Sequence, residues 1–496
     1  MNLPGLLAAL LLTPLVGAAA LLALRDKPHL CEAMSLVVAG VLFSCVAALL
    51  PAVMSGARPE LQVFEFLPGI VFSFHAEPLG VAFALVVAFL WFITVLYAIG
   101  NMRAHGETHL PRFYLFFMLA IAATIGGAFA GNLLTLYFFY EVLTLATYPL
   151  VTHGREERDR AAGRTYLTVL LGTSVVFLLT AMAWTYALTG SLSFVEGGVF
   201  LRGDELVPGL SPGLLALIFA LFVFGTGKAA LMPFHRWLPA AMVAPTPVSA
   251  LLHAVAVVKL GVFAVLKVTV YIFGLLSLTI HAAAELIQYV AAATLLIAAV
   301  FALRENNVKL RLAYSTISQL AYIVLAATLA NHLSILAGGM HIIVHAFAKI
   351  TLFFCAGMFL VSLHKTTVEE LRGVGRVMPV TATAWLIASL CVVGLPLTGG
   401  FWSKWYLAQG ALDAGKPLMM LVVLMGSLLA AGYLLPPAIR AFYAPAPPGA
   451  APELPPQLGR EGPRSSLAAL TITAAACVVL FFTAQPILRF LEGFAH

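Results

Sequence analysis

Fourteen predominantly apolar stretches, each long enough to cross a bilayer as a helix, follow one another along this chain. A transmembrane helix needs about 20 such residues, and the chain is 62% hydrophobic and only 10% charged, a balance that soluble domains do not have. The pattern predicts an all-α polytopic membrane protein of about 14 transmembrane helices. The predicted spans are 3–24, 31–54, 78–100, 112–131, 133–152, 164–190, 211–231, 246–271, 281–303, 310–330, 334–362, 380–401, 417–439 and 466–490.

The basic residues predict the orientation of these helices. Most of the 27 lysines and arginines lie in loops that follow odd-numbered spans. The positive-inside rule then places those loops in the cytoplasm and both termini on the outer face of the cell (inner) membrane. The net charge of +6 therefore reflects topology and does not indicate a nucleic-acid partner. The N-terminus resembles a signal peptide in its small residues, but it lacks a basic n-region, so we expect a first transmembrane helix.

The cysteines argue against a cofactor. The chain has five, and they are scattered, without a CxxC motif or a cluster with histidine. This spacing predicts neither a disulfide framework nor an iron–sulfur or other metal site. No GxGxxG or other nucleotide motif is present. We expect a chain without a cofactor and without a catalytic redox site of its own.

Ionisable residues concentrate in the stretch 222–267. It places Lys228, His253 and Lys259 inside two apolar segments separated by a proline-rich break. A lysine at the centre of a span costs about 2.5–3.5 kcal/mol on insertion scales. Such residues mark ion paths, although a lone histidine in a span is also a common structural hydrogen-bonding group. Lys267 lies near a helix end, where its amine is expected to extend to the headgroups.

Glu141 is the one acidic residue deep in a predicted span. A buried carboxylate beside a buried lysine can alternate between a charged and a neutral pair, which holds and releases a proton. A purely structural Glu–Lys pair is the alternative, although such pairs are often no better than apolar packing.

A second break at 394–407 contains several glycines, Pro396 and Lys404. Interrupted, charged segments at corresponding positions of two halves are typical of transporters built from inverted repeats. Helices 4–8 and 9–13 are the predicted five-helix repeats, with broken helices 7 and 12. The predicted divisions are N-terminal helices 1–110, first repeat 111–271, second repeat 278–440, a cytoplasmic proline- and glycine-rich linker 441–465, and a last helix 466–496.

His341, His345 and Lys349 are spaced i, i+4 and i+8, which stacks them along one helical face about 6 Å apart per step. Imidazole titrates near neutral pH and suits a proton relay. Structural hydrogen bonding and metal binding are the alternatives. A metal site usually has a third ligand, and none is evident.

Taken together, these segments resemble the antiporter-like subunits shared by Mrp-type monovalent cation/proton antiporters, respiratory complex I and energy-converting membrane-bound hydrogenases. The resemblance covers about residues 110–440. The matching text is LYFFYEVLTLATYPL, GKAALMPFHRWLPAAMVAPTPVSALLHAVAVVKLGVF, NNVKLRLAYSTISQLAYIVLA, GGMHIIVHAFAKITLFFCAG, TTVEELRGVGRVMP and GLPLTGGFWSKWYLAQG.

The resemblance implies a role for each matching side chain. Glu141 resembles the fifth-helix glutamate that pairs with the lysine of the broken seventh helix, here Lys228. Lys259 resembles the central eighth-helix lysine. His345 and Lys349 resemble the eleventh-helix relay, and Lys404 resembles the terminal lysine of the broken twelfth helix. Protons would step along this row in mid-membrane. The family usually has an acidic residue where this chain has Ala240, so the role of that position is in doubt.

The resemblance also implies a function and partners. It indicates an ion-translocating subunit that moves protons, with exchange for Na⁺ in the antiporter version, beside homologous and small membrane subunits of one complex. The chain ends soon after its fourteenth span, which favours the D-type Mrp protein. Membership of a complex I-like oxidoreductase or hydrogenase is the alternative. A stand-alone solute transporter is less favoured, because the breaks offer lysine, histidine and hydroxyl groups. A scaffold with a decayed path conflicts with the retained ionisable residues.

Overall fold

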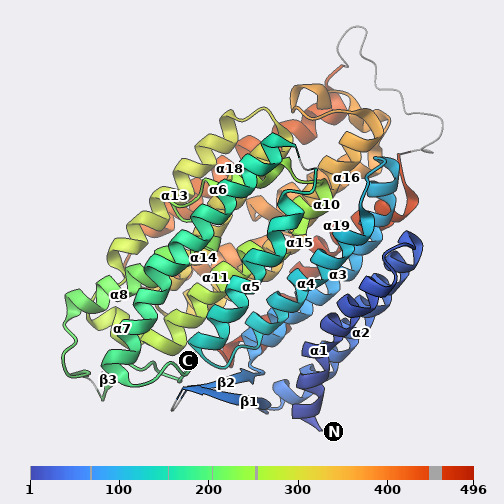
Figure 1. Cartoon of the computed structure of the whole chain (residues 1–496). Coiled ribbons are helices and arrows are strands. Elements are labelled where there is room, and N and C mark those ends of the chain that lie inside the picture. The colour runs from blue at the N-terminus through green and yellow to red at the C-terminus, as the bar shows by residue number, and fades with distance from the viewer. Residues whose placement is uncertain are drawn as a thin grey trace.

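The fold is a bundle of long, roughly aligned helices with two small β-hairpins at one end (Figure 1). This computed structural model describes residues 2–67, 70–154, 156–203, 205–251, 255–445 and 461–495. The fold confirms the predicted all-α polytopic membrane class, with the hairpins β1–β2 and β3–β4 as small additions.

The elements of the first part are α1 (Leu3–Ala23), α2 (Pro28–Met54), β1 (Glu60–Leu67), β2 (Ile70–His75), α3 (Pro78–Ala104), α4 (Leu110–Ala128), α5 (Leu133–Val151), α6 (Glu157–Thr173), η1 (Ser174–Leu178), α7 (Leu179–Thr189), β3 (Leu201–Arg202), β4 (Glu205–Leu206), α8 (Pro212–Gly225), η2 (Gly227–Ala229), α9 (Trp237–Ala240), η3 (Ala241–Val243), α10 (Thr246–Ala250) and α11 (Val257–Val268). The second part contains η5 (Thr269–Phe273), α12 (Leu275–Ile280), α13 (Glu285–Arg304), α14 (Val308–Leu329), α15 (His332–Leu363), η6 (Glu369–Leu371), η7 (Val374–Arg376), α16 (Pro379–Val393), α17 (Gly400–Asp413), α18 (Pro417–Tyr443), α19 (Arg464–Phe482) and α20 (Ala484–Glu492).

Each of the predicted spans coincides with a helix or an interrupted helix. Within the described residues, 11 helices are long and apolar enough to cross a membrane, or up to 12 if a bent pair counts as one span. The other predicted spans contain shorter helices: α8 ends before η2, and α16 ends at the break predicted around Pro396. In the predicted span 246–271, α10 and α11 lie on either side of residues 252–254, which are outside the described residues.

Glycine determines the break between α16 and α17. Gly394 ends α16 in the left-handed region at φ +89°, a conformation that glycine adopts without a steric cost. Pro396 follows, and a proline cannot continue the helix. Gly400 begins α17 with the carbonyl of Cys391 packed against its Cα, so a Cβ has no room there.

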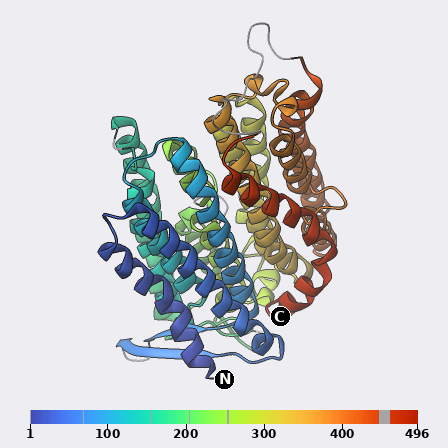
Figure 2. The same cartoon turned by 90° about the vertical axis from the view of Figure 1, so that its right-hand side faces the viewer.

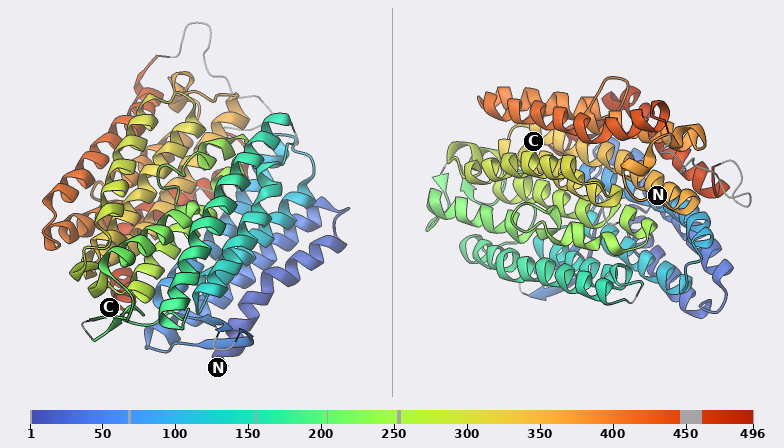
Figure 3. Two further views of the ribbon diagram at one scale, coloured as in Figure 1. Left: turned by 60° about the vertical axis from the view of Figure 1, so that its left-hand side comes forward. Right: turned by 90° about the horizontal axis from the view of Figure 1, so that it is seen from above.

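The helices form layers. The helices of the C-terminal part, α16 to α19, lie on one side of the bundle, and the helices around α6 lie on the opposite side (Figures 2 and 3). Between them, α14 and α15 are the most buried of the long apolar helices, and α15 contacts α3, α11, α14, α16 and α17. This central position allows α15 to join the two halves.

Both termini lie at the same end of the bundle (Figures 1 and 2). Arg58, just before β1, donates from Nη2 to the carbonyl of Gly493 at 3.4 Å. At the N-terminus, α1 packs against α2 and α4 as part of the helical bundle. The side of the membrane on which the termini lie stays a prediction.

Little of the predicted linker 441–465 can be compared with the structure, because residues 446–460 lie outside the described ranges. Its last part is fixed by Glu461, whose carboxylate accepts from the backbone N–H groups of Val380 and Thr381 at 2.8 and 2.9 Å. Glu461 thereby satisfies free donors at the start of α16, a position that also favours a negative charge.

Candidate functional site

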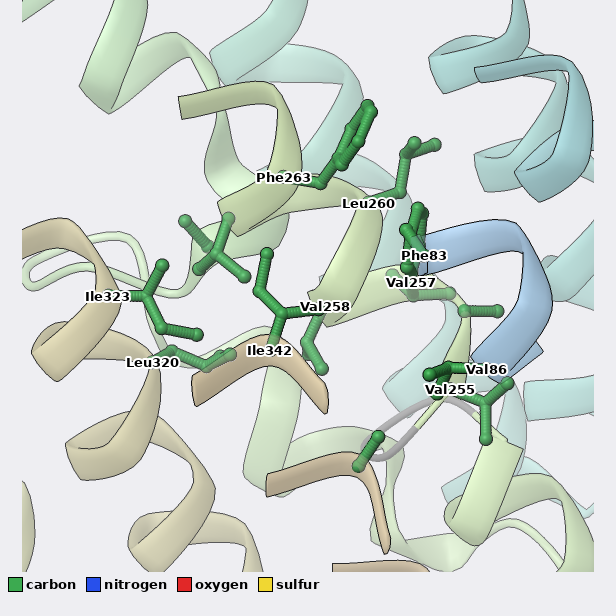
Figure 4. Packing of buried hydrophobic residues seen from close by; sticks show 14 of the residues in the cluster. Phe83, Val86, Val255, Val257, Val258, Leu260, Phe263, Leu320, Ile323 and Ile342 are labelled. Atoms are coloured by element: carbon green, nitrogen blue, oxygen red, sulfur yellow. The ribbon is translucent and has the colours of Figure 1, made fainter. Parts of the chain in front are cut away.

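A dense apolar layer surrounds the middle of the bundle around α11. Figure 4 shows Leu260 and Phe263 of α11 beside Phe83 of α3, and Val258 beside Ile342 of α15. The rings of Phe83 and Phe263 stack with centroids 5.0 Å apart. Burying an ionisable side chain in such a layer is costly unless protein groups bind it, so the contacts of each one are described in turn.

Lys228 lies in η2, between the end of α8 and the proline-rich segment, and is fully buried. Its ammonium donates to the carbonyl of Tyr140 at 2.8 Å and to the hydroxyl of Thr144 at 2.5 Å. It also lies 3.2 Å from the centroid of the Tyr140 ring. The unwound backbone after α8 thus brings this amine against α5.

Glu141 lies next to this site on α5 but does not hold the lysine in this conformation. Both of its carboxylate oxygens are buried and make no hydrogen bond to any described residue. The predicted Glu141–Lys228 partnership therefore remains a prediction, and the structure describes a conformation in which Tyr140 and Thr144 bind the amine.

Lys259 connects the two halves of the site. It is fully buried on α11, and its Nζ lies 2.5 Å from Nδ1 of His345 on α15. Gly261, two residues further along α11, packs directly against the backbone and Cβ of Lys228. A Cβ at this glycine would push η2 away, so Gly261 keeps the Lys228 segment against α11.

Two members of the predicted row on α15, His341 and His345, lie one above the other. The rings of His341 and His345 stack with centroids 5.7 Å apart and an interplanar angle of 12°. His341 Nδ1 lies 2.9 Å from the hydroxyl of Ser403 on α17. Each ring keeps a buried Nε2 without a hydrogen-bond partner among the described residues. The row therefore extends from Lys259 to the residue that precedes Lys404.

Lys404 lies in the second break. Its amine donates to the carbonyls of Val392 and Val393 at 2.8 and 3.1 Å and to the hydroxyl of Ser427 at 3.0 Å. The free carbonyls at the end of α16 attract a cation, because a helix C-terminus carries partial negative charge. The amine also lies 4.6 Å from the centroid of the Tyr322 ring.

The lysines in the two breaks have similar surroundings, because each amine lies over a tyrosine ring. Lys228 lies over Tyr140 of α5, and Lys404 lies over Tyr322 of α14. Under the predicted repeats, α5 and α14 are both the second helix of their repeat. This match is the pattern that an inverted repeat would produce, although the repeat boundaries remain a prediction.

Lys349 points towards α14 and not along the row. Its amine donates to the carbonyl of Leu312 at 3.2 Å and to the hydroxyl of Ser315 at 2.6 Å. Ser315 in turn donates to the hydroxyl of Tyr433 on α18 at 2.9 Å. Lys349 thus begins a branch towards α18. The remaining predicted site residue, His253, lies outside the described residues.

The expected position of Lys267 was wrong. Its side chain is buried and forms an ion pair with Glu77 at 2.8 Å, and its amine donates to the carbonyl of Ala130 at 2.7 Å. Extension to the headgroups is therefore excluded in this structure. Glu77 directly precedes α3, so hydropathy placed it outside a span, whereas the fold buries it.

Several polar groups were missed from the sequence: Tyr140, Thr144, Ser315, Tyr322, Ser403 and Ser427. Hydroxyl groups in transmembrane spans commonly bond to their own helix. Their position in the sequence therefore does not indicate which of them contact a buried lysine or histidine. Only the lysine or histidine brought beside each of them by the fold identifies it.

A polar cavity of about 470 Å³ lies at the end of the bundle with the basic loops and is lined by Glu107, Asp159 and Lys309 among others. Lys309 donates to the carbonyl of Ala244 at 2.6 Å. Beside it, burial lowers the pKa of His153, and the nearby charge of Glu107 offsets this only in part. The neutral ring donates from Nε2 to the carbonyl of Thr108 at 3.1 Å. The cavity wall includes Thr246, where α10 begins.

The fold and the buried row of lysines and histidines define a polytopic membrane protein of the antiporter-like class. Residues 130–430 match the family described as NADH:quinone oxidoreductase/Mrp antiporter, transmembrane. The chain belongs to this family.

Relatives include both redox and antiporter proteins. The chain is 32% identical over 449 residues to NADH-quinone oxidoreductase subunit N of Desulforudis audaxviator, covering 89% of this chain and 88% of that protein. It is 29% identical over 464 residues to a probable K(+)/H(+) antiporter protein of Rhizobium meliloti, covering 92% of this chain but 45% of that protein. For several other curated relatives, the chain likewise spans only about half of their length.

Solved structures share the fold. A chain of the Mrp complex from Dietzia sp. DQ12-45-1b has a TM-score of 0.85 at 23% identity, covering 100% of this chain and 97% of that one. A chain of respiratory complex I from Thermus thermophilus has a TM-score of 0.76 at 25% identity, covering 97% and 98%. Both neighbours are chains of multi-subunit membrane complexes.

Proposed function

We propose that this chain is the ion-translocating membrane subunit of a multi-subunit complex in the cell membrane. It moves protons along the row Glu141, Lys228, Lys259, His345, His341 and Lys404, with Lys349 as a branch. The observation that carries the proposal is the 2.5 Å contact between the buried Lys259 and His345. A buried amine against an imidazole nitrogen has little structural value and can pass a proton between two helices.

The first step is a change of partner by Lys228. In the conformation described here, Tyr140 and Thr144 bind its amine, and Glu141 makes no hydrogen bond within the described part of the chain. Loss of a proton from Glu141 draws the amine towards the carboxylate, and protonation of Glu141 returns it to the Tyr140 carbonyl and the Thr144 hydroxyl. The polar cavity beside α10 supplies water access from the end with the basic loops, which the positive-inside rule assigns to the cytoplasm.

The parent complex is proposed to be of the Mrp cation/proton antiporter type. The Dietzia structure is named as an Mrp complex, and the Rhizobium relative is named as part of a K(+)/H(+) antiporter. A complex I-like oxidoreductase is the second candidate. It is favoured by the match over 88% of an NADH-quinone oxidoreductase subunit N. In both versions other membrane subunits lie beside this chain, and the subunits that co-purify with it distinguish the two.

Glu141→Ala and Lys228→Ala are each expected to lower proton flux to near the leak of protein-free vesicles, because each removes one side of the first transfer. The measurement is dye-monitored proton flux in vesicles reconstituted with the purified complex. Matched controls are Glu369→Ala and Lys27→Ala, which change exposed residues outside the long apolar helices. Flux close to that of the unmodified protein, with normal assembly, would contradict the assigned roles.

A further inference from the structure

Two buried lysines of the proposed row lie over an aromatic ring. The Nζ of Lys228 lies 3.2 Å from the centroid of the Tyr140 ring. The Nζ of Lys404 lies 4.6 Å from the centroid of the Tyr322 ring. An ammonium within about 6 Å of a ring centroid is attracted by the negative face of the ring. All four side chains are buried, so little water weakens this attraction.

In the described part of the chain, neither of these amines forms an ion pair with a carboxylate. The described lysines that form such pairs are Lys267 and Lys416. Glu141, the proposed partner of Lys228, makes no hydrogen bond to any described residue. A buried ammonium without an opposite charge is costly. In each break, the tyrosine ring is therefore the group whose charge distribution opposes that of the ammonium, beside neutral carbonyls and hydroxyls.

The Tyr322 ring is fixed in its position by groups on two other helices. Its hydroxyl donates to the carbonyl of Val423 on α18 at 3.0 Å. The ring also stacks with that of His341 on α15, with centroids 5.6 Å apart and an interplanar angle of 26°. Ser427, one turn from Val423 on α18, accepts from the amine of Lys404 at 3.0 Å. Tyr322 thus contacts both His341 and Lys404, the last two members of the proposed row.

Tyr140 is tied to Lys228 through its backbone and its hydroxyl as well as its ring. The hydroxyl accepts from the backbone N–H of Lys228 at 3.0 Å, and the carbonyl accepts from the amine at 2.8 Å. The ring is therefore in place for the ammonium whenever Glu141 does not bind it.

We propose that the tyrosine ring in each break takes the place of a counter-ion and holds the lysine there as an ammonium ion. Tyr140 serves Lys228 in this way, and Tyr322 serves Lys404. The ring attracts the ammonium far more than the neutral amine, because the attraction acts on the charge. It also binds less strongly than a carboxylate, so the proton can still leave. Each break would then store one proton of the row, a consequence that rests on the proposed function, whereas the ring contact does not.

The test replaces Tyr322 by phenylalanine and by phenylalanines that carry one, two or three ring fluorines. Fluorine withdraws electrons from the ring face at nearly constant size, so the attraction for an ammonium weakens stepwise. Each ring is introduced into the full chain with Lys404 present and with Lys404→Met. Thermal unfolding of the purified complex in detergent and proton flux in reconstituted vesicles are measured on the same preparations.

With Lys404 present, we expect the unfolding midpoint to fall with each added fluorine. Proton flux should fall in the same order, by about tenfold from the phenylalanine to the trifluorophenylalanine variant. In Lys404→Met, fluorination should leave the midpoint unchanged, because the ring has no ammonium to attract. A ring that only fills space would give the same midpoint for all four variants.

Tyr97 is the matched control. Its buried ring stacks on Phe354 with centroids 3.9 Å apart, and the same fluorine series there should act equally with and without Lys404. The proposal is overturned if fluorination at position 322 does not change the midpoint, or changes it equally in both backgrounds. A fall of the midpoint that requires Lys404, with unchanged flux, would support the ring contact and overturn its part in transport. Failure of the proposed function is recognised separately, by flux retained in Glu141→Ala and Lys228→Ala.

Discussion

Lys259→Met is expected to reduce proton flux to the leak of protein-free vesicles while the protein stays at least as stable. Lys259 is the amine that contacts His345, and this contact joins α11 to α15. Methionine nearly matches the length of the lysine stem but carries no proton. Replacing a buried charge by an apolar group of similar volume is often neutral or stabilising. Flux and thermal stability, measured on the same preparation, should therefore separate.

His345→Phe tests the other side of the same contact. If the two residues form one link, the double variant Lys259→Met/His345→Phe should lose no more flux than either single variant, because groups that act as a unit are not additive. Lys27→Met, at an exposed loop position, is the matched control and should keep full flux. Substantial flux in Lys259→Met would show that protons pass between the halves by another route.

Breaking the Glu77–Lys267 ion pair is expected to be the largest stability effect. Glu77→Gln or Lys267→Met alone leaves one buried charge without its partner, which costs about 3–5 kcal/mol. The double variant Glu77→Gln/Lys267→Met removes both charges and should recover most of that loss. The measurement is unfolding of the purified protein in detergent, analysed as a double-mutant cycle.

The same cycle decides whether Lys267 takes part in transport. We expect the double variant, once folded, to keep proton flux per protein close to the original value, because the pair lies outside the row that leads from Lys228 to Lys404. Stability losses that simply add in the double variant would show that the pair is not coupled. Lost flux in a stable double variant would place Lys267 on the path.

The sequence predicted which side chains to examine, because a charge inside an apolar span is costly wherever the span packs. Lys228, Lys259, Lys349 and Lys404 all stood out for that reason, and all are buried in the structure. The breaks after α8 and α16 were also predictable, since proline and glycine act on the backbone locally.

Local sequence patterns did not predict which side chains contact one another. Lys267 was expected at the headgroups, yet it pairs with Glu77, far away in the chain. The pairing of Lys228 with Glu141 stays a prediction, and the sequence did not indicate that Tyr140 and Thr144 of the same helix bind its amine in this structure. Each outcome depends on which face of one helix meets which face of another, and apolar faces of similar composition do not specify that choice individually.

By itself, the amino-acid sequence determined that the chain crosses a membrane many times, where two of its spans break, and which ionisable side chains lie inside apolar segments. Only the tertiary structure decided that Lys259 meets His345 across 86 residues of sequence and that Lys267 pairs with Glu77. Burial and backbone breaks follow from local composition. Contacts between side chains of different helices depend on how the helices pack, and local composition does not set that packing.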